Sequence, residues 1–378
     1  MFNTAGIGKS IASTVKKAAL SSVADTIDLL HSLYTVILLT TFAVVAGSGQ
    51  LFGKPLQCLI AAHIDKVRGW SAYILGYCYV VGTTKQESID SIPTEEDRLK
   101  YYQWLPLFFC FQIFCFRFLH LFWLWLQSLL YIDVKTVLKE SNSLTKVFDP
   151  KLRKEKAQQI AEYIWGYFYF RTLEAKGWQR IFIHPAVFTW FYFIIKICNL
   201  VHVLIQLVSI TKFLGFNDGW VLKIFAAFLA SESSNHTYFP QTVYCTYKIT
   251  TSNDIVNGQT YTSQCFLTIN EYNEKILIIL WVWFIIVSSL SLLNLLYFLR
   301  FFTGQMFTTY VQELSDHDSE LCKASQQFFS TLMGSDGLLI LHLISSRSGS
   351  MTSSLILKEI WNKYARSTKD RIPEYALI

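Results

Sequence analysis

Ile276–Leu299, with the sequence ILIILWVWFIIVSSLSLLNLLYFL, runs for 24 residues without Asp, Glu, Lys, Arg or His. A helix needs about 20 predominantly apolar residues to cross the hydrocarbon core of a bilayer. Lipid offers no hydrogen-bond partners, so a single segment of this length satisfies its backbone there only as a helix. The stretch 276–299 is therefore predicted to be a transmembrane helix.

Three further stretches have comparable length and apolar character. We predict spans at 33–52, 104–131 and 187–210, of which the second contains Arg117 and the third contains Lys196. Over the whole chain, 52% of residues are hydrophobic and 16% are charged, whereas about 25% are charged in a soluble globular domain. The predicted fold is an all-α integral membrane protein with four transmembrane helices.

No motif for catalysis or nucleotide binding stands out in the sequence. Walker, Rossmann and zinc-finger spacings are absent, and the eight histidines follow no metal-ligand pattern. The net charge of +6 is modest and gives no argument for binding nucleic acid. We therefore predict a protein that is not an enzyme and has no cofactor, no bound metal and no nucleic-acid partner.

The distribution of basic residues predicts the orientation of the chain in the membrane. Lys and Arg number ten in segment 132–182, eight in segment 300–378 and three in segment 1–27. The two remaining loops, 53–103 and 211–275, hold six and four. Basic residues favour the cytoplasmic side. Both termini and the middle loop are therefore predicted to be cytoplasmic, with helical segments in the middle loop and the tail, and the other two loops are predicted to be extracellular.

Each predicted extracellular loop contains a pair of cysteines, and both pairs have the same spacing of 20 residues. Cys58 and Cys78 belong to the first loop, and Cys245 and Cys265 belong to the second. Disulfides persist in oxidising compartments, which agrees with the orientation predicted from charge. Four cysteines allow three pairings, and the spacing does not choose among them. The single N-glycosylation sequon begins at Asn235 in the second loop, which makes Asn235 a candidate glycosylation site.

Several short motifs follow one another in a fixed order along the chain. They are Gly53-Lys54-Pro55-Leu56-Gln57-Cys58, Tyr101-Tyr102-Gln103-Trp104, Phe239-Pro240 before Cys245, Asn270 and Asn273-Glu274-Lys275 after Cys265, and Gly334-Ser335-Asp336-Gly337 with Leu343-Ile344-Ser345. In this order and spacing, they resemble the innexin family, the invertebrate gap-junction proteins. Tyr101 to Trp104 in particular looks like the YYQW motif of that family.

The resemblance implies a gap-junction channel subunit in the plasma membrane, at contacts between cells. Identical or mixed innexin subunits would assemble in membrane lipid into a cyclic oligomer of eight, the hemichannel. This hemichannel would dock onto that of a neighbouring cell, and ions and small molecules would pass passively through the joined pore. The resemblance also implies the disulfide pairing Cys58–Cys265 and Cys78–Cys245.

The N-terminal segment 1–27 carries apolar residues at helical spacing. Ile7 and Ile11 are four residues apart, and Lys9 lies off that face. The periodicity alone favours an amphipathic helix on the inner leaflet or a partly disordered arm. The family resemblance implies instead that the segment folds into the pore mouth, which makes Ile7, Lys9 and Ile11 candidate pore-lining residues.

Two basic residues lie within predicted spans that contain no acidic residue. A charge in the middle of a bilayer is costly unless it reaches the surface, pairs with another charge or meets water. Arg117 and Lys196 are predicted to reach the cytoplasmic surface or to pair, and Asp28 is a candidate partner for Lys196. The alternative puts one of the two on the pore wall.

Two other functions remain open at this stage. A glycan on Asn235 would hinder docking, and the chain would then form a non-junctional, pannexin-like hemichannel that releases small solutes. A four-pass adhesion or scaffold protein of the claudin or tetraspanin kind would have no pore. Those two families have different cysteine patterns in their extracellular loops, so the paired spacing argues against this class.

Overall fold

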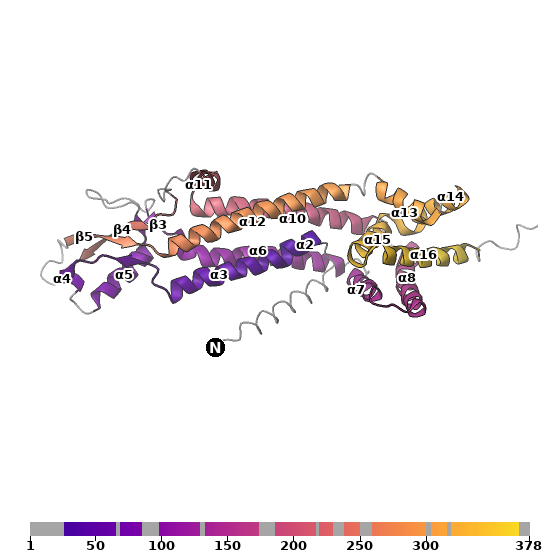
Figure 1. The fold of residues 1–378 in the computed structure, drawn as a ribbon, viewed down its shortest axis with the longest axis horizontal. Helices are drawn as coiled ribbons and strands as arrows, with labels where there is room; N and C mark the ends of the chain where they lie inside the picture. Colours follow the sequence, from indigo (N-terminus) through magenta and orange to yellow (C-terminus); the bar gives the residue numbers. More distant parts are fainter. Residues whose placement is uncertain are drawn as a thin grey trace, which may run out of the picture. The chain divides into compact units, whose positions relative to one another are not determined.

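The computed structural model of the chain describes residues 26–65, 69–84, 98–128, 133–173, 186–216, 219–229, 238–249, 259–299, 304–315 and 319–369. In this part of the chain, four helices are long and apolar enough to cross a membrane (Figure 1). They cover Ile27–Leu51, Tyr101–Ser128, Val187–Leu214 and Ile269–Phe298. The predicted all-α membrane fold with four spanning helices is therefore confirmed.

The first spanning helix is composite, and the other three are continuous. It consists of the α-helical turn α2 (Thr26–Leu29), the π-helical segment η1 (Leu30–Tyr34) and α3 (Thr35–Leu51). The others are α6 (Tyr101–Ser128), α10 (Val187–Leu214) and α12 (Ile269–Phe298). Helical hydrogen bonding continues beyond the apolar runs, so α12 already begins at Ile269, before the charge-free stretch.

The chain divides into two compact units. The sheet unit comprises 35–117 and 202–288, and the helical unit comprises the described residues of 1–34, 118–201 and 289–378. The helices α6, α10 and α12 contribute residues to both units.

The sheet unit contains a five-stranded antiparallel sheet built from both loops that carry cysteine pairs (Figure 1). The strand order is β1-β5-β4-β2-β3. The strands are β1 (Gln57–Cys58), β2 (Thr83–Thr84), β3 (Arg98–Leu99), β4 (Thr242–Ile249) and β5 (Gln259–Phe266). The sequence analysis does not predict this sheet. Three of the strands have only two residues each, too few to produce an alternating pattern.

The hairpin β4–β5 forms the middle of the sheet, and alternate residues of β4 are buried. Val243, Cys245 and Tyr247 lie on the buried face, as expected from the two-residue period of a strand. Three short helices complete the loops of this unit: α4 (Ala62–Asp65), α5 (Trp70–Val81) and α11 (Trp220–Leu229).

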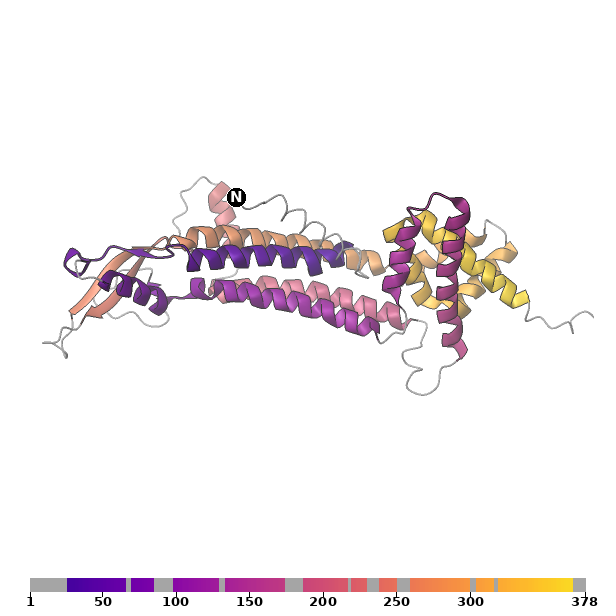
Figure 2. The same ribbon diagram turned by 90° about the horizontal axis from the view of Figure 1, so that it is seen from below.

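The helical unit packs the segment after α6 against the C-terminal segment. In Figure 2, α7 and α8 lie beside the yellow helices α15 and α16. The helices beyond the spans are α7 (Val134–Leu144), α8 (Pro150–Leu173), α13 (Gln305–Ser315), α14 (Ser319–Phe328), η4 (Phe329–Met333), α15 (Gly334–Ser348) and α16 (Ser350–Lys369). Their apolar faces share one core, which includes Ile164, Phe168, Leu339, Ile344 and Ile360. The predicted helical character of both segments is confirmed.

A side-chain cap begins helix α7. The Asp133 carboxylate accepts hydrogen bonds from the Thr136 hydroxyl at 2.6 Å and the Thr136 backbone N–H at 3.0 Å. These bonds, chiefly the one from the hydroxyl, hold the pKa of Asp133 below its usual value. The stabilisation is therefore complete above the unfolded-state pKa of about 3.9, and it is lost as pH falls through the lower folded-state pKa.

Replacing Asp133 with alanine is expected to weaken the start of α7 by about 1 kcal/mol, because an N-cap side chain satisfies an otherwise unpaired N–H. Asparagine caps equally well without a titratable group. Hydrogen exchange of the α7 amides should therefore be faster in Asp133→Ala. In Asp133→Asn, the protection of these amides should equal that of the parent chain at neutral pH, and it should no longer fall at acidic pH. Equal exchange in all three chains would contradict the capping role.

Candidate functional site

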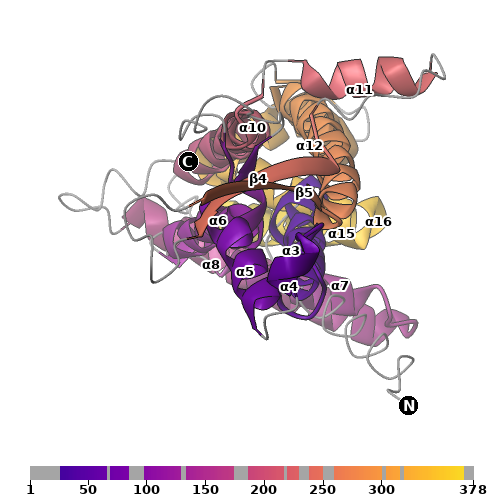
Figure 3. The ribbon, with the colours of Figure 1, turned by 90° about the vertical axis from the view of Figure 1, so that its left-hand side faces the viewer.

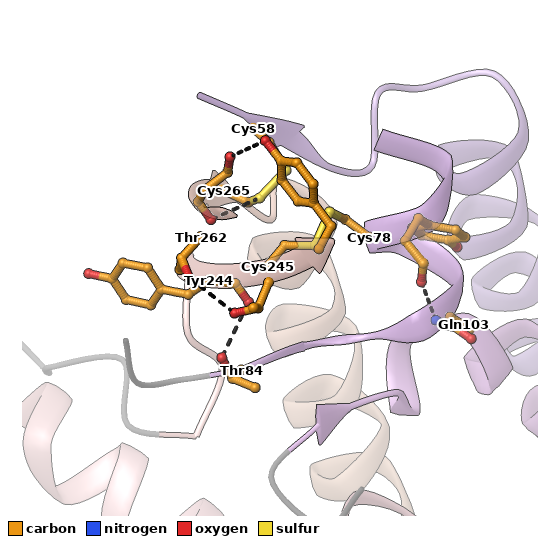
Figure 4. The surroundings of a disulfide bond; sticks show 12 residues. Cys58, Cys78, Thr84, Gln103, Tyr244, Cys245, Thr262 and Cys265 are labelled. Atoms are coloured by element: carbon orange, nitrogen blue, oxygen red, sulfur yellow. Dashed lines mark hydrogen bonds between the residues drawn. A yellow bond between two sulfur atoms is a disulfide. The ribbon is translucent and has the colours of Figure 1, made fainter. Parts of the chain in front are cut away.

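Two disulfides connect the loop between α3 and α6 to the loop between α10 and α12 (Figure 4). Cys58 on β1 is bonded to Cys265, its neighbour on β5, with an S–S distance of 2.00 Å. Cys78 on α5 is bonded to Cys245 on β4, with an S–S distance of 1.96 Å. Of the three pairings that the sequence leaves open, this is the inter-loop pairing that the family resemblance implies.

The cluster of sulfur atoms is not a thiolate site. Among the described residues, one group of three potential metal ligands is found, namely Cys58, Cys78 and Cys265. A metal-binding cysteine must be a free thiolate, and each of these sulfurs is part of a disulfide.

The tetrad that begins α6 connects this helix to both loops. The Tyr101 hydroxyl donates a hydrogen bond to Asn270 Oδ1 at 2.8 Å, and Asn270 Nδ2 donates to the Pro240 carbonyl at 2.9 Å. Tyr101 is buried and meets Phe216 and Phe239 edge-on, with centroid distances of 6.3 and 6.0 Å. The second loop is thereby attached to the beginning of both α6 and α12.

The next two residues of the tetrad hold the end of α5 in the first loop. The Tyr102 hydroxyl donates to the Tyr79 carbonyl at 3.3 Å. Gln103 Nε2 donates to the carbonyls of Tyr79 and Val80, which the last turn of a helix leaves without intrahelical partners (Figure 4). Burial, and to a lesser extent the neighbouring Tyr102, raises the pKa of Tyr79 to about 12, so its phenol stays neutral at physiological pH. Trp104, the fourth member, is 57% exposed.

A proline inside α6 leaves one backbone carbonyl without its helical hydrogen-bond donor, and a side chain of α3 supplies a donor. Pro106 has no N–H, so it cannot donate the usual helical bond to the carbonyl of Tyr102, four residues earlier. Gln50 Nε2 donates to that carbonyl instead, at 2.5 Å. Gly47 of α3 faces the same proline, and an added Cβ there would lie 3.9 Å from Pro106 Cβ, an ordinary van der Waals distance.

Replacing Gln50 with leucine is expected to destabilise the protein by about 1–3 kcal/mol, because the Tyr102 carbonyl would be buried without a donor. In a Pro106→Ala background, the restored N–H at position 106 would satisfy that carbonyl, so Gln50→Leu should cost much less. Thermal unfolding of the solubilised parent chain, the two single variants and the double variant measures the coupling between Gln50 and Pro106. An equal loss in both backgrounds would show that Gln50 does not replace the missing helical bond.

In the helical unit, Lys196 is paired with Asp28. Lys196 Nζ lies 2.8 Å from Asp28 Oδ2, and the two side chains are only 5% and 12% exposed. Tyr192 and Asn199 each donate a further hydrogen bond to the carboxylate, at 3.3 Å. The ammonium group also lies 4.9 Å from the centroid of the Tyr192 ring. Pairing, rather than reaching the surface, therefore accommodates this basic residue within its helix.

Of the remaining predicted site residues, one lies in the described part of the chain. Arg117 is exposed on α6. Ile7, Lys9 and Ile11 lie outside the described residues, as does Asn235.

The motif near the C-terminus caps the third spanning helix. Asp336 Oδ1 accepts hydrogen bonds from the Thr189 backbone N–H at 2.9 Å and from its hydroxyl at 3.0 Å, in the first turn of α10. A carboxylate is favourable there because the first N–H groups of a helix lack intrahelical partners and the N-terminal end of the helix dipole is positive. Gly337 beside it admits no side chain without rearrangement, because a Cβ would lie 2.8 Å from Met333.

Sequence reasoning missed the roles of Gln50 and of Asp336. The signal for Gln50 is Pro106, since a proline within an apolar helix leaves a carbonyl that needs a donor from elsewhere. Asp336 occurs in a motif quoted above, but no local pattern indicates that it caps a helix 147 positions away in the sequence.

Four spanning helices, together with disulfides between two of the connecting loops, define a four-pass membrane protein with cross-linked loops. The family model Innexin matches residues 24–364, so the chain belongs to the innexin family. Its relatives include three innexins of Caenorhabditis elegans. It is 27% identical to Innexin-14 over 89% of this chain and 86% of that protein. The identity is 25% to Innexin eat-5 (89% and 86%) and 24% to Innexin unc-9 (96% and 97%).

As a member of this family, the chain is a structural subunit of a gap-junction channel, through which ions and small molecules pass passively between adjacent cells. It is a multi-pass membrane protein of gap junctions, and it assembles with innexin subunits into an oligomer. Nothing in the described part of the chain favours the non-junctional hemichannel or the adhesion protein.

Proposed function

We propose that the five-stranded sheet faces the extracellular space and that both termini and segment 132–182 face the cytoplasm. The observation that carries this proposal is the pair of disulfides between the two loops. Because the bridges join both loops, both must be on one side of the membrane, and disulfides persist on the oxidising side. The excess of Lys and Arg in 132–182 and 300–378 supports the same orientation.

Docking to the hemichannel of a neighbouring cell is the proposed role of the five-stranded sheet. Docking requires a surface that keeps its form, and two disulfides bind both loops into one sheet. The edge strands β1 and β3 are two residues long, which limits unspecific strand pairing at either edge.

The proposed hemichannel is a ring of eight subunits, alike or mixed. A single four-helix subunit encloses no wide aqueous path, so the pore forms between subunits. Transport through it needs no catalytic step and no cofactor, because selectivity follows from the pore diameter and the charge of its wall. Ile7, Lys9 and Ile11 are the proposed lining of the cytoplasmic mouth.

Paired-cell electrophysiology tests docking, with each cell expressing this chain alone. The proposal predicts a junctional current between the paired cells. A large current in single cells without junctional current would favour the non-junctional hemichannel. Counting subunits in single-particle images of the solubilised oligomer tests the number eight.

Orientation has its own test in intact cells. Reduction with an impermeant phosphine, followed by a charged maleimide, should label the four disulfide cysteines from outside. A chain with serine at Cys58, Cys78, Cys245 and Cys265 provides the control and should stay unlabelled. Labelling only in permeabilised cells would show that the four cysteines face the cytoplasm, opposite to the proposed orientation.

A further inference from the structure

Helix α11 is a strongly apolar helix outside both the spans and the sheet. Its sequence, WVLKIFAAFL, contains Lys223 as its single charged residue. At about 1.5 Å per residue it is roughly 15 Å long, half of what the hydrocarbon core requires. It therefore cannot cross the membrane, although it is more apolar than a helix exposed to water needs to be.

Two glycines turn the chain into α11 at the end of α10. Gly215 and Gly219 have φ angles of +67° and +83°, a region that side chains disfavour. After this turn, α11 runs crosswise to the adjoining ends of α10 and α12. Figure 1 shows α11 end-on beside these two helices, and Figure 3 shows it lengthwise where they are end-on.

One face of α11 is held by aromatic residues. Trp220 is 1% exposed, lies 5.5 Å from Phe216 and 5.8 Å from Phe239 between ring centroids, and donates from Nε1 to the Thr211 hydroxyl at 3.4 Å. Val221 is buried as well. These contacts fix the roll of the helix, so its other face points away from the unit.

The outward face is apolar with one cation beside it. Leu222 is 64% exposed, and Ala226, one turn later, is also exposed, as is Lys223. Exposed Leu204, Ile205 and Val208 on α10 make up an apolar surface of the kind that faces lipid, and α11 begins where α10 ends. An apolar helix therefore follows a spanning helix with lipid-type exposed residues and runs across its end.

We propose that α11 is an interfacial helix, lying in the headgroup region of the leaflet on the sheet side. Leu222 and Ala226 would contact acyl chains, and the Lys223 ammonium would reach lipid phosphates. An amphipathic helix parallel to the membrane plane, with a basic residue at its edge, has this arrangement. The proposal needs only the four spanning helices and holds whether or not hemichannels dock.

Spin-label accessibility in the full chain tests this proposal. A parent chain with alanine at the four cysteines outside the disulfides, and with unchanged thermal stability, receives one new cysteine at a time. Leu222→Cys is the test position, Val208→Cys on α10 is the lipid control and Thr260→Cys on exposed β5 is the water control. Each chain is labelled with a nitroxide and reconstituted in phosphatidylcholine bilayers.

The measurement compares collisions with oxygen, which concentrates in lipid, and with a water-soluble nickel chelate. The expected ratio of oxygen to nickel accessibility at position 222 is several-fold higher than at 260 and approaches that at 208. A ratio equal to that at 260 would place α11 in water. Protection from both reagents would place it against protein, such as a neighbouring subunit. Either result would overturn the proposal.

Discussion

Replacing Cys58 and Cys265 together with serine is expected to abolish the junctional current between paired cells that express this chain alone. Strand β1 has only two residues, so few ladder hydrogen bonds hold it on β5. The bridge joins positions 207 residues apart, and removing a native disulfide typically costs about 2–5 kcal/mol. Losing it should release β1 from β5 and so disrupt the proposed docking surface, although Cys78–Cys245 still holds the rest of the first loop.

The control for this experiment is Cys110→Ser, since Cys110 is a free cysteine on α6. That variant should keep its junctional current and its thermal stability. Surface labelling of all chains separates loss of docking from loss of delivery to the membrane. A normal current from the double-serine chain at equal surface level would show that docking does not need this bridge.

Replacing Lys196 with methionine is expected to cause the largest loss of stability of any substitution in the helical unit considered above. The change would leave the Asp28 carboxylate buried without its ammonium partner. Removing one member of a buried ion pair typically costs about 3–5 kcal/mol, because the remaining charge is desolvated and uncompensated. The unfolding temperature of the solubilised protein and its level at the cell surface should both fall.

The double variant Asp28→Asn with Lys196→Met distinguishes a lost pair from a lost lysine. Because no charge then remains buried, much of the stability should return. Lys275→Met is the control on an exposed pair, in which Lys275 lies 2.9 Å from Glu271, and it should have no measurable effect. A double variant as unstable as Lys196→Met alone would show that the pairing is not what makes Lys196 necessary.

The spanning helices were predictable because the requirement that they meet is local. A bilayer demands about 20 consecutive apolar residues, whatever the rest of the chain does. The stretch 276–299 meets it without a charge, and each of the others meets it with at most one Lys or Arg. Helix ends were less predictable. They depend on caps such as Asp336 on the first turn of α10.

The candidate site was predictable in its residues and much less in its geometry. Equal spacing of the two cysteine pairs left three pairings open, and the family resemblance pointed to one of them. The tetrad from Tyr101 to Trp104 was found as a motif. Its contacts with Asn270 and Tyr79 were not, since they join positions 169 and 23 residues apart in the sequence.

The sequence by itself determined that the chain has four membrane spans and two loops with paired cysteines, because apolar length and residue type are properties of contiguous segments. Only the tertiary structure decided that these loops form one sheet, that Gln50 replaces the bond lost at Pro106, and that α11 turns across its neighbours. The physical reason is common to all three. The partners are separated by other segments of the chain, and a hydrogen bond or a packing contact forms only when folding brings them within a few ångströms.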